Sequence, residues 1–444
     1  MIRFLSKFII PIFVRNDKTI TLLNYQLGLD FALEQDQKDA LSAYRNQFHI
    51  PKDKQGNELI YMTGNSLGLQ PKITKKYINQ ELEDWANLGV EGHTNAKNPW
   101  LKYHEFLTES MSEIVGAKPN EVVVMNTLTV NLHLMMVSFY KPTAKRYKIL
   151  IEADAFPSDK YAVESQLRHH GFNDKEGLIL WKARQGKELV NYEDLEAIFE
   201  AHGNEIALVM IGGVNYYTGQ YFDMKRITNL GHKHGCMVGF DCAHGAGNVE
   251  LNLHDSGADF AVWCTYKYLN SGPGSLAGCF VHERHANNKD LNRFTGWWSH
   301  NKETRFRMRD EFDQLPGAEG WQLSNPPILS MAAIKASLDM FHQVGIKKLV
   351  EKSKNLTGYF EFLLKQLGED TLRIITPSNP EERGCQLSIQ VKNADKSLHH
   401  KLTEAGVISD WREPDVIRCA PVPLYNSFQD VYHLVNKLKV ILNE

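Results

Sequence analysis

The chain has 444 residues, which is too many for one compact core, so we expect two structural units. Hydrophobic residues make up 43% of it and charged residues 23%, which is typical of a soluble globular protein. Lys and Arg number 50 against 53 for Asp and Glu, a net charge of −3, so nothing in the composition indicates a nucleic acid or an anionic membrane as partner.

The first fifteen residues are basic and apolar. One interpretation is a signal peptide or membrane anchor, and the other is a loosely docked leader. The second is favoured because the apolar run is too short to span a bilayer, Pro11 interrupts it and no small-residue cleavage site follows. No other stretch is a candidate membrane span.

From about residue 120, apolar strand-like runs alternate with helical patterns. We expect helices over 129–140, about 160–170 and 223–235, and strands over 121–126, 146–153, 205–214, 236–241, 259–264 and 276–283. This alternation predicts an α/β protein with a mixed, mostly parallel sheet covered on both faces. Ligands of such sheets bind beyond the carboxyl ends of the strands, which is where candidate residues are sought.

The pattern changes after residues 324–328. A long helix, shorter strands and further helices are expected there, at 329–367, 386–391, 396–405 and from Ser427 onward. We therefore predict a leader and arm (1–60) packing on a small domain, a large domain (61–328), and a small α+β domain (329–444).

The six cysteines contain no C-x-x-C pair: Cys236, Cys242, Cys264, Cys279, Cys385 and Cys419. Four of them lie in apolar, strand-like runs. Buried reduced thiols in a cytoplasmic protein fit this arrangement better than disulfides or a zinc cluster, and no metal site is expected.

The strongest signal is the pair Asp241 and Lys267, each at the end of a predicted strand. A lysine in a dry pocket can form an imine with an aldehyde cofactor, and a carboxylate on the cofactor's pyridine nitrogen keeps that nitrogen protonated. Alone, the lysine would be a surface charge and the aspartate a helix cap. Together, at neighbouring strand ends and flanked by glycines, they favour the functional interpretation.

A phosphate site is expected on the same edge of the sheet. Leu128 and Thr129 open a helix whose exposed amides favour an anion, although Thr at a helix start is usually only a cap. After the next strand, Phe156 could stack on an aromatic cofactor, and Ser158 and Asp159 could hydrogen-bond to it. A turn followed by a helix cap explains those residues nearly as well.

Four further residues have two interpretations each. His244 is either a packed core histidine or a neighbour of the cofactor, and Tyr266 either packs in the core or transfers a proton. Trp297, beside Trp298, is most simply an interface or core aromatic. Arg418 lies in an apolar, Pro-rich turn, where its partner is either a substrate carboxylate or a structural acidic residue.

From about Thr21 to its end, the chain resembles the kynureninase family of pyridoxal-phosphate (PLP) enzymes, which have the aminotransferase-like fold type I. The resemblance includes the stretch from Asp241 to Lys267 and the strings GNSLGLQP (64–71), LTVNLH (128–133), FPSD (156–159), YTGQ (217–220), SNPPI (324–328), EERGCQL (381–387) and APVPLYNS (420–427). It implies hydrolysis of L-kynurenine or 3-hydroxy-L-kynurenine to anthranilate or 3-hydroxyanthranilate and L-alanine. It also implies a homodimer with shared active sites, and a role in tryptophan catabolism and NAD biosynthesis.

The resemblance also implies roles for single residues. Lys267 would hold PLP and Asp241 would pair with its ring nitrogen, with Tyr266 close by. For the reaction itself, Tyr266 is our candidate for moving a proton at the substrate carbonyl. Further cofactor contacts would come from Leu128, Thr129, Phe156, Pro157, Ser158, Asp159, Gly212, His244, Trp297 and Asn325. The substrate would be bound by Arg418 at its carboxylate, and by His93, Ser324 and Asn325 near its ring. Gly212 stands where the family can carry a serine, so a hydroxyl contact would be lost.

Two alternatives remain open at this point. A cysteine desulfurase or class V aminotransferase has the same fold, but a desulfurase needs a mobile thiol, and Cys385 is the only candidate outside the predicted strands of the large domain. The other alternative is an inactive protein of this fold that serves as an interaction scaffold.

Overall fold

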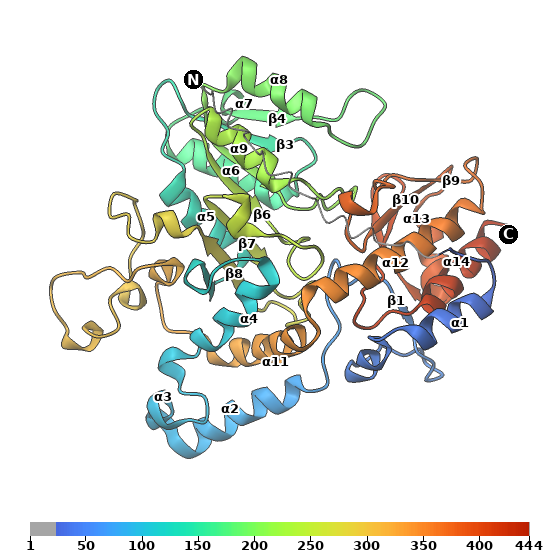
Figure 1. Ribbon diagram of the computed structural model, residues 1–444, viewed down its shortest axis with the longest axis horizontal. Coiled ribbons are helices and arrows are strands. Elements are labelled where there is room, and N and C mark those ends of the chain that lie inside the picture. Colours follow the sequence, from blue (N-terminus) through green and yellow to red (C-terminus); the bar gives the residue numbers. More distant parts are fainter. Residues whose placement is uncertain (1–23, 444) are drawn as a thin grey trace, which may run out of the picture.

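The computed structural model describes residues 24–443, so the predicted leader, residues 1–15, lies outside the described residues. The described chain forms a large α/β unit and a smaller α+β unit side by side (Figure 1). Within residues 24–443, no helix has the length and apolar character needed to cross a membrane.

The large unit is built on a seven-stranded sheet. Its order, from edge to edge, is β2 (Val122–Met125), β8 (Ala277–Val281), β7 (Phe260–Cys264), β6 (Met237–Asp241), β5 (Ile206–Gly212), β3 (Lys148–Glu152) and β4 (Leu178–Trp181). Only β8 runs antiparallel to its neighbours. The prediction of a mixed, mostly parallel sheet is confirmed.

Helices cover both faces of this sheet because alternate residues of each strand point to opposite sides. On β7, Phe260 and Val262 belong to the core under α5 (Leu128–Phe139) and α6 (Pro157–His169). Ala261 and Trp263 belong to the core on the other face, which is covered by α4 (Glu105–Val115), α9 (Met224–Lys233) and α11 (Ile328–Val344). Every residue of β7 is buried, as its apolar sequence predicts.

The second unit is a four-stranded antiparallel sheet, β12 (Asp410–Arg412), β13 (Val416–Cys419), β10 (Leu387–Val391) and β9 (Leu372–Ile374). Its core also takes side chains from helices α1 (Leu29–Lys38), α12 (Ile346–Lys365), α13 (Lys396–Glu404) and α14 (Phe428–Leu442). The short strands β1 (Ile60–Tyr61) and β11 (Val407–Ile408) pair in parallel, which ties the N-terminal arm to this unit. Ser427 caps α14, as expected.

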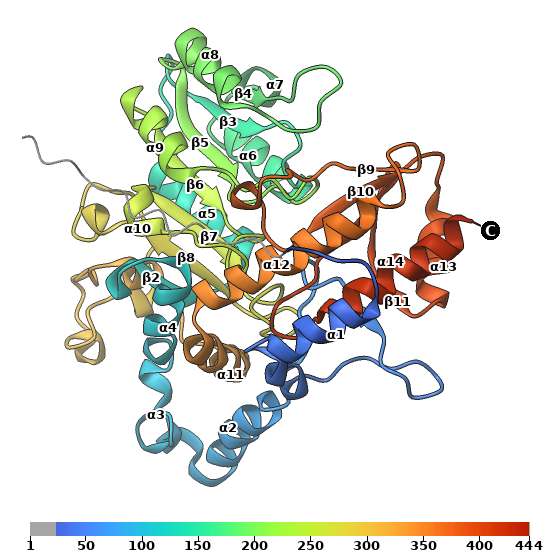
Figure 2. The same ribbon diagram turned by 45° about the vertical axis from the view of Figure 1, so that its right-hand side comes forward.

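The prediction of one helix over 329–367 was wrong. The chain turns at Gly345, which has a φ of +80° and separates α11 from α12. Only glycine adopts such a backbone without strain, and the periodic pattern on either side concealed the break. α11 packs on α2 (Thr74–Leu88) and α4, whereas α12 packs on α14, so the two helices belong to different cores (Figure 2).

Several elements of the large unit were not anticipated, among them helices α2 and α4, strand β4 and helix α8 (Tyr192–His202). Most of β4 is only partly buried because it forms the sheet edge, which weakens its apolar pattern. All six cysteines are buried and unpaired, as predicted.

Candidate active site

A cavity of about 170 Å³ lies at the carboxyl ends of the parallel strands. Strand ends and the turns that follow them supply its lining: Leu128, Thr129, Glu152, Phe156, Ser158, Asp159, Gly212, Val214, Tyr216, Asp241, Ala243, His244, Tyr266 and Lys267. The structure therefore brings together most of the side chains that were singled out from the sequence.

Asp241 and Lys267 enter this cavity from neighbouring strands. Asp241 is the last residue of β6, and Lys267 lies in the turn that follows β7. That turn rests on the N-terminal segment, because the Gly68 amide donates to the Tyr266 carbonyl at 2.8 Å. A Cβ on Gly68 would lie 2.3 Å from the Lys267 carbonyl oxygen, so this contact requires glycine.

Aromatic rings form one wall of the cavity. Phe156 caps α6 and remains 45% exposed, and its ring meets the Tyr216 ring edge-on with centroids 5.2 Å apart. The Lys267 Nζ lies 5.8 Å from the Phe156 centroid. This places a flat apolar surface close to the amine, which suits a planar ring bound through that amine.

Three carboxyl groups are buried around the same space: Glu152, Asp159 and Asp241. Burial raises the pKa of all three, and the neighbouring carboxyl of Asp241 raises that of Asp159 further. For Glu152 the pKa rises to about 7. Glu152 was not predicted, because as the last residue of an apolar strand it carries no motif.

Two buried polar atoms of the lining have no hydrogen-bond partner among residues 24–443, Asp159 Oδ1 and His244 Nδ1. Burial and the nearby Lys267 hold the pKa of His244 well below its usual range, so its ring is neutral. Unpartnered buried polar atoms are rare in folded proteins, and a polar ligand in the cavity would satisfy them. This is the observation on which PLP fits the site.

The starts of helices α5 and α6, which contribute to the lining, suit a phosphate group. Thr129, in the first turn of α5, and Ser158, in the first turn of α6, lie with their hydroxyl oxygens 3.1 Å apart. The unpaired amides of both helix starts favour an anion at this point, and Pro157 occupies the first position of α6.

Tyr266 precedes Lys267 and is half-buried. Burial raises the pKa of its phenol, and Cys264 beside it raises it further, so the phenol keeps its proton at neutral pH. It can therefore donate a hydrogen bond into the cavity.

Arg418 reaches the edge of the cavity from the second unit. It lies on β13, only 1% of its side chain is exposed, and its Nη1 donates to the Tyr216 carbonyl at 2.6 Å. Its Nη2 pairs with Asp410, which also accepts from Arg412 at 3.1 Å. The structural ion pair anticipated as an alternative is thus present, while the Nε remains without a partner among the described residues.

Six predicted residues do not line the cavity: Pro157 and Arg418, which adjoin lining residues, and His93, Trp297, Ser324 and Asn325, which do not. Ser324 and Asn325 are exposed, and the Trp297 indole donates to the Arg305 carbonyl at 3.3 Å. His93 packs edge-on against Trp100, at 5.5 Å between centroids. Within this single chain the structure does not bring them to Lys267.

Cys385 does not have the properties of a nucleophile. It is buried, burial raises the pKa of its thiol to about 12, and its amide is held by Asn248 Oδ1 at 2.9 Å. A catalytic thiol needs the opposite environment.

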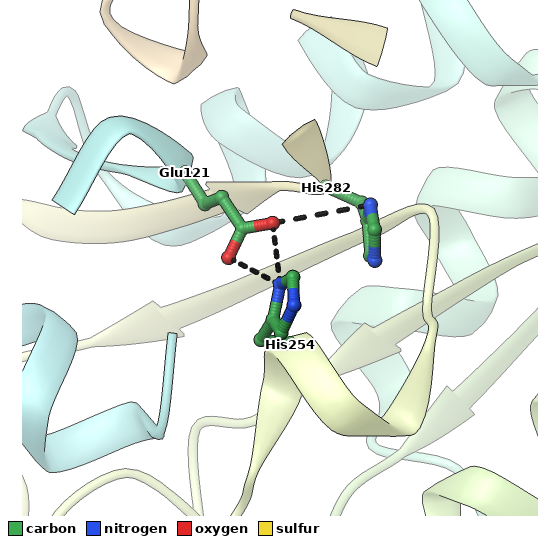
Figure 3. A group of neighbouring side chains, drawn as sticks. All are labelled: Glu121, His254 and His282. Atoms are coloured by element: carbon green, nitrogen blue, oxygen red, sulfur yellow. Dashed lines mark hydrogen bonds and ion pairs between the residues drawn. The ribbon is translucent and has the colours of Figure 1, made fainter. Parts of the chain in front are cut away.

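A second polar group involves Glu121, His254 and His282 and lies outside this cavity (Figure 3). Glu121 accepts from the Lys118 and Glu283 amides at 2.9 and 2.8 Å, and His254 Nδ1 lies 2.9 Å from it. His282 Nδ1 accepts from the Arg284 amide at 3.2 Å. Because these atoms already have protein partners, the group serves as a structural joint between β8 and the segments before β2 and β7.

The family model and the curated relatives that match this sequence all point to one family. The model of the kynureninase C-terminal domain matches residues 349–438. A kynureninase of Myxococcus xanthus is 58% identical over 409 residues, 92% of this chain and 96% of the relative, and one of Koribacter versatilis is 54% identical over 414 residues, 93% and 98%. A kynureninase of Nematostella vectensis is 48% identical over 431 residues, 92% and 93%.

Similar solved structures include a C-DES mutant with glycine covalently linked to its PLP cofactor and the cysteine desulfurase CsdA of Escherichia coli. The first has a TM-score of 0.74 at 16% identity, covering 89% of this chain and 98% of its own. The second has a TM-score of 0.73 at 15% identity, covering 91% and 98%. At this identity they establish the fold alone.

Proposed function

Because the chain belongs to the kynureninase family, and is thus a PLP-dependent hydrolase of carbon–carbon bonds, we propose that it acts on both L-kynurenine and 3-hydroxy-L-kynurenine. The products are anthranilate or 3-hydroxyanthranilate, and L-alanine. The observation that carries the proposal is that Lys267 and Asp241 line one cavity with two unpartnered polar atoms.

The residues that would hold PLP follow from the chemistry of the lining. Lys267 would bind the aldehyde group, Asp241 would pair with the ring nitrogen, and Phe156 would pack against the ring; all three line the cavity. Leu128, Thr129, Ser158 and the first turns of α5 and α6 receive the phosphate. When bound, PLP withdraws electrons from the substrate carbon to which its imine is attached.

The protein's own side chains supply the proton transfers. The Lys267 amine would act as the base that takes the proton from Cα. Tyr266 keeps its phenolic proton and can donate it to the γ-carbonyl oxygen as water adds to Cγ, before the Cβ–Cγ bond breaks. Arg418 binds the α-carboxylate through its free Nε, and His244 and Asp159 hold the ring edge.

Steady-state kinetics with both kynurenines tests this proposal, with the arylamine product followed by fluorescence and alanine quantified separately. We expect one alanine for each arylamine. Lys182 follows strand β4 as Lys267 follows β7, but it is exposed, so Lys182→Ala is a matched control that should retain full activity. Absence of arylamine from both substrates would contradict the proposal.

We further propose a homodimer whose partner supplies His93, Trp297, Ser324 and Asn325, which lie away from this chain's cavity. Large apolar side chains remain exposed near them, including Trp85 at 61% and Met308 at 72%. Exposed patches of this kind mark interaction surfaces. Trp297 and Asn325 would then contact the cofactor, and His93 and Ser324 the substrate, across the interface.

Complementation between inactive variants tests the shared site. Lys267→Ala and Trp297→Ala each remove one contribution, and a mixed dimer regains one intact site only if the two residues come from different chains. Random reassociation should then restore about one quarter of the parental activity. No recovery, with dimers detected by ultracentrifugation, would mean that each chain builds its own site.

A cysteine desulfurase is the alternative with the same fold. The buried Cys385 argues against it, and incubation with L-cysteine should release no sulfide. We also propose that the protein is cytoplasmic, that its products enter tryptophan catabolism and NAD biosynthesis, and that the division into arm (1–60), large domain (61–328) and small domain (329–444) holds.

A further inference from the structure

The ion pair of Arg418 includes a second arginine, Arg412, which the reaction outlined above does not use. Asp410 and Arg412 are two residues apart on β12, and Arg418 lies opposite Asp410 on β13. Because side chains alternate along a strand, these three residues share one face of the sheet. Asp410 accepts from the Arg412 Nη2 at 3.1 Å and pairs with the Arg418 Nη2. One carboxylate is therefore shared by two guanidinium groups.

Both guanidinium groups lie close enough to the cavity to affect the charge of its lining. Arg418 donates to the carbonyl of Tyr216, which is a lining residue, and its Cζ lies 5.8 Å from the centroid of the Tyr216 ring. Burial lowers the pKa of the lining residue His244, and the charges of Lys267 and both arginines lower it further. Arg412 and Arg418 therefore act on the space in which the substrate would lie.

The three side chains together carry one net positive charge. Within residues 24–443, Asp410 is the only acidic residue that forms an ion pair with either arginine. Only 1% of the Arg418 side chain and 13% of the Asp410 side chain are exposed, so water solvates this charge poorly. The Nε of each arginine is buried and has no hydrogen-bond partner among the described residues. A single carboxylate would supply both the missing negative charge and the missing acceptors.

We propose that Arg412, Asp410 and Arg418 form one carboxylate site with a single net positive charge, in which Asp410 limits the ligand to one negative charge. The inference rests on the proposed role of Arg418 in binding the α-carboxylate of the substrate. It adds that Arg412 supplies a second positive charge and that Asp410 cancels one of the two. The site therefore selects a substrate end with one carboxylate and disfavours a doubly charged group, such as a dicarboxylate or a phosphate.

Binding of two matched carboxylates to the PLP-loaded protein tests this charge selection without kynurenine turnover. At about pH 7.5, benzoate carries one negative charge and phthalate carries two on the same ring. Both dissociation constants are measured by calorimetry. The ratio of the benzoate constant to the phthalate constant then reports the preference of the site for a double charge.

Asp410→Asn leaves both arginines without a counterion, so phthalate gains twice the Coulomb attraction that benzoate gains, and the ratio should rise at least about tenfold. Adding Arg412→Gln to that variant restores one net charge, and the ratio should return to within about threefold of the parental value. Arg412→Gln alone leaves Arg418 paired with Asp410 and should lower the ratio at least about threefold. Asp370→Asn removes the same charge at an exposed site of the second unit and is the control, with the parental ratio expected.

Three results would overturn the inference. One is an Asp410→Asn protein that binds phthalate no better than the parent, because Asp410 would then have a structural role alone. Another is a double variant that keeps the ratio of Asp410→Asn, because Arg412 would then contribute no charge to the site. The third is an unchanged ratio in Arg412→Gln, which decides the question even if Asp410→Asn does not fold.

Failure of this inference is distinguishable from failure of the proposed function. A protein that shows the expected ratios but cleaves neither kynurenine would refute the proposed function and leave the inference intact. A protein that cleaves kynurenine with the same ratio in all variants would refute the inference alone.

Discussion

The large sheet carries buried acidic residues at both ends of its strands, and their pKa values are shifted in opposite directions at the two ends. Near the beginning of β7, Asp259 accepts from His232, His285, Arg284 and the Val238 amide, and these partners hold its pKa well below the usual range. At the other end, burial without such partners raises the pKa of Glu152, Asp159 and Asp241. At the first end the protein itself supplies the hydrogen-bond partners of the buried carboxylate, whereas at the second end a ligand is needed to supply them.

This contrast separates stability from function. Substitutions at the satisfied end should unfold the protein while leaving each folded molecule active. Substitutions at the end whose carboxyl groups lack such partners should abolish or alter the reaction but change the free energy of unfolding little. The groups there have few favourable interactions in the folded protein that a substitution could remove. The following four predictions test that separation.

The largest effect is expected for Lys267→Ala. Removing the amine eliminates both the attachment of PLP and the proton transfer at Cα, so kcat should fall by at least about 10⁴-fold. The visible absorbance of the bound cofactor should be lost, with the melting temperature of the PLP-free protein almost unchanged. Measurable turnover near the parental rate would show that another residue serves as the base.

Asp259→Asn tests the opposite end. It leaves Arg284, whose side chain is 35% exposed, with a weaker partner, and the free energy of unfolding at pH 7 should fall by about 1–3 kcal/mol. Because the pKa of Asp259 is lowered on folding, its contribution is present above about pH 4 and is lost as pH falls further. The difference between variant and parent in urea denaturation should therefore shrink in acid, while kcat per folded molecule stays constant.

Glu152→Gln should show the reverse pH dependence in the PLP-free protein. The pKa of Glu152 is raised to about 7 on folding, so the ionising carboxyl destabilises the native state increasingly from about pH 4.5 to 7. Relative to the parent, the variant should gain stability over this range, by about 3 kcal/mol at most. A constant difference between the two unfolding free energies would mean that Glu152 ionises normally.

The smallest effect is expected for Arg418→Lys. A lysine cannot hold Asp410, the Tyr216 carbonyl and a substrate carboxylate at once, so kcat/KM should fall roughly tenfold to a hundredfold, mainly through KM. PLP affinity should not change. A fall in kcat alone would place Arg418 outside substrate binding.

Much of this arrangement could be predicted from local patterns. Strand ends and the turns after them mark Asp241 and Lys267, since apolar runs stop abruptly there, and the helix start at Leu128 is visible in the same way. The helix expected from about residue 160 begins earlier, at Pro157. Glu152 could not be found, because its importance depends on β3 lying next to β5 in the sheet. Strand order is a property of tertiary packing and leaves no trace in local periodicity.

For other residues too, the sequence did not reveal which groups surround them in the fold. Arg418 stood out as a charge in an apolar stretch, but only the fold reveals that Asp410 and the Tyr216 carbonyl hold it. Trp297 and Asn325 were expected at the cofactor from the family resemblance, and a single chain does not place them there. We propose that a second chain places them there, and local patterns within one sequence do not reveal such contacts.

The hydrogen bond from Arg418 to the Tyr216 carbonyl has a consequence for which substrates can be accepted. It joins the second unit to the loop after β5, whose Tyr216 lines the cavity with Lys267, so in the proposed role of Arg418 this bond fixes where the substrate carboxylate is held. An α-amino acid carries its amine and carboxylate on one carbon, whereas a β-amino acid separates them by one carbon more. The enzyme should therefore discriminate by backbone length before it meets the aromatic ring, and homologated analogues should fail to bind even when the aryl group is unchanged.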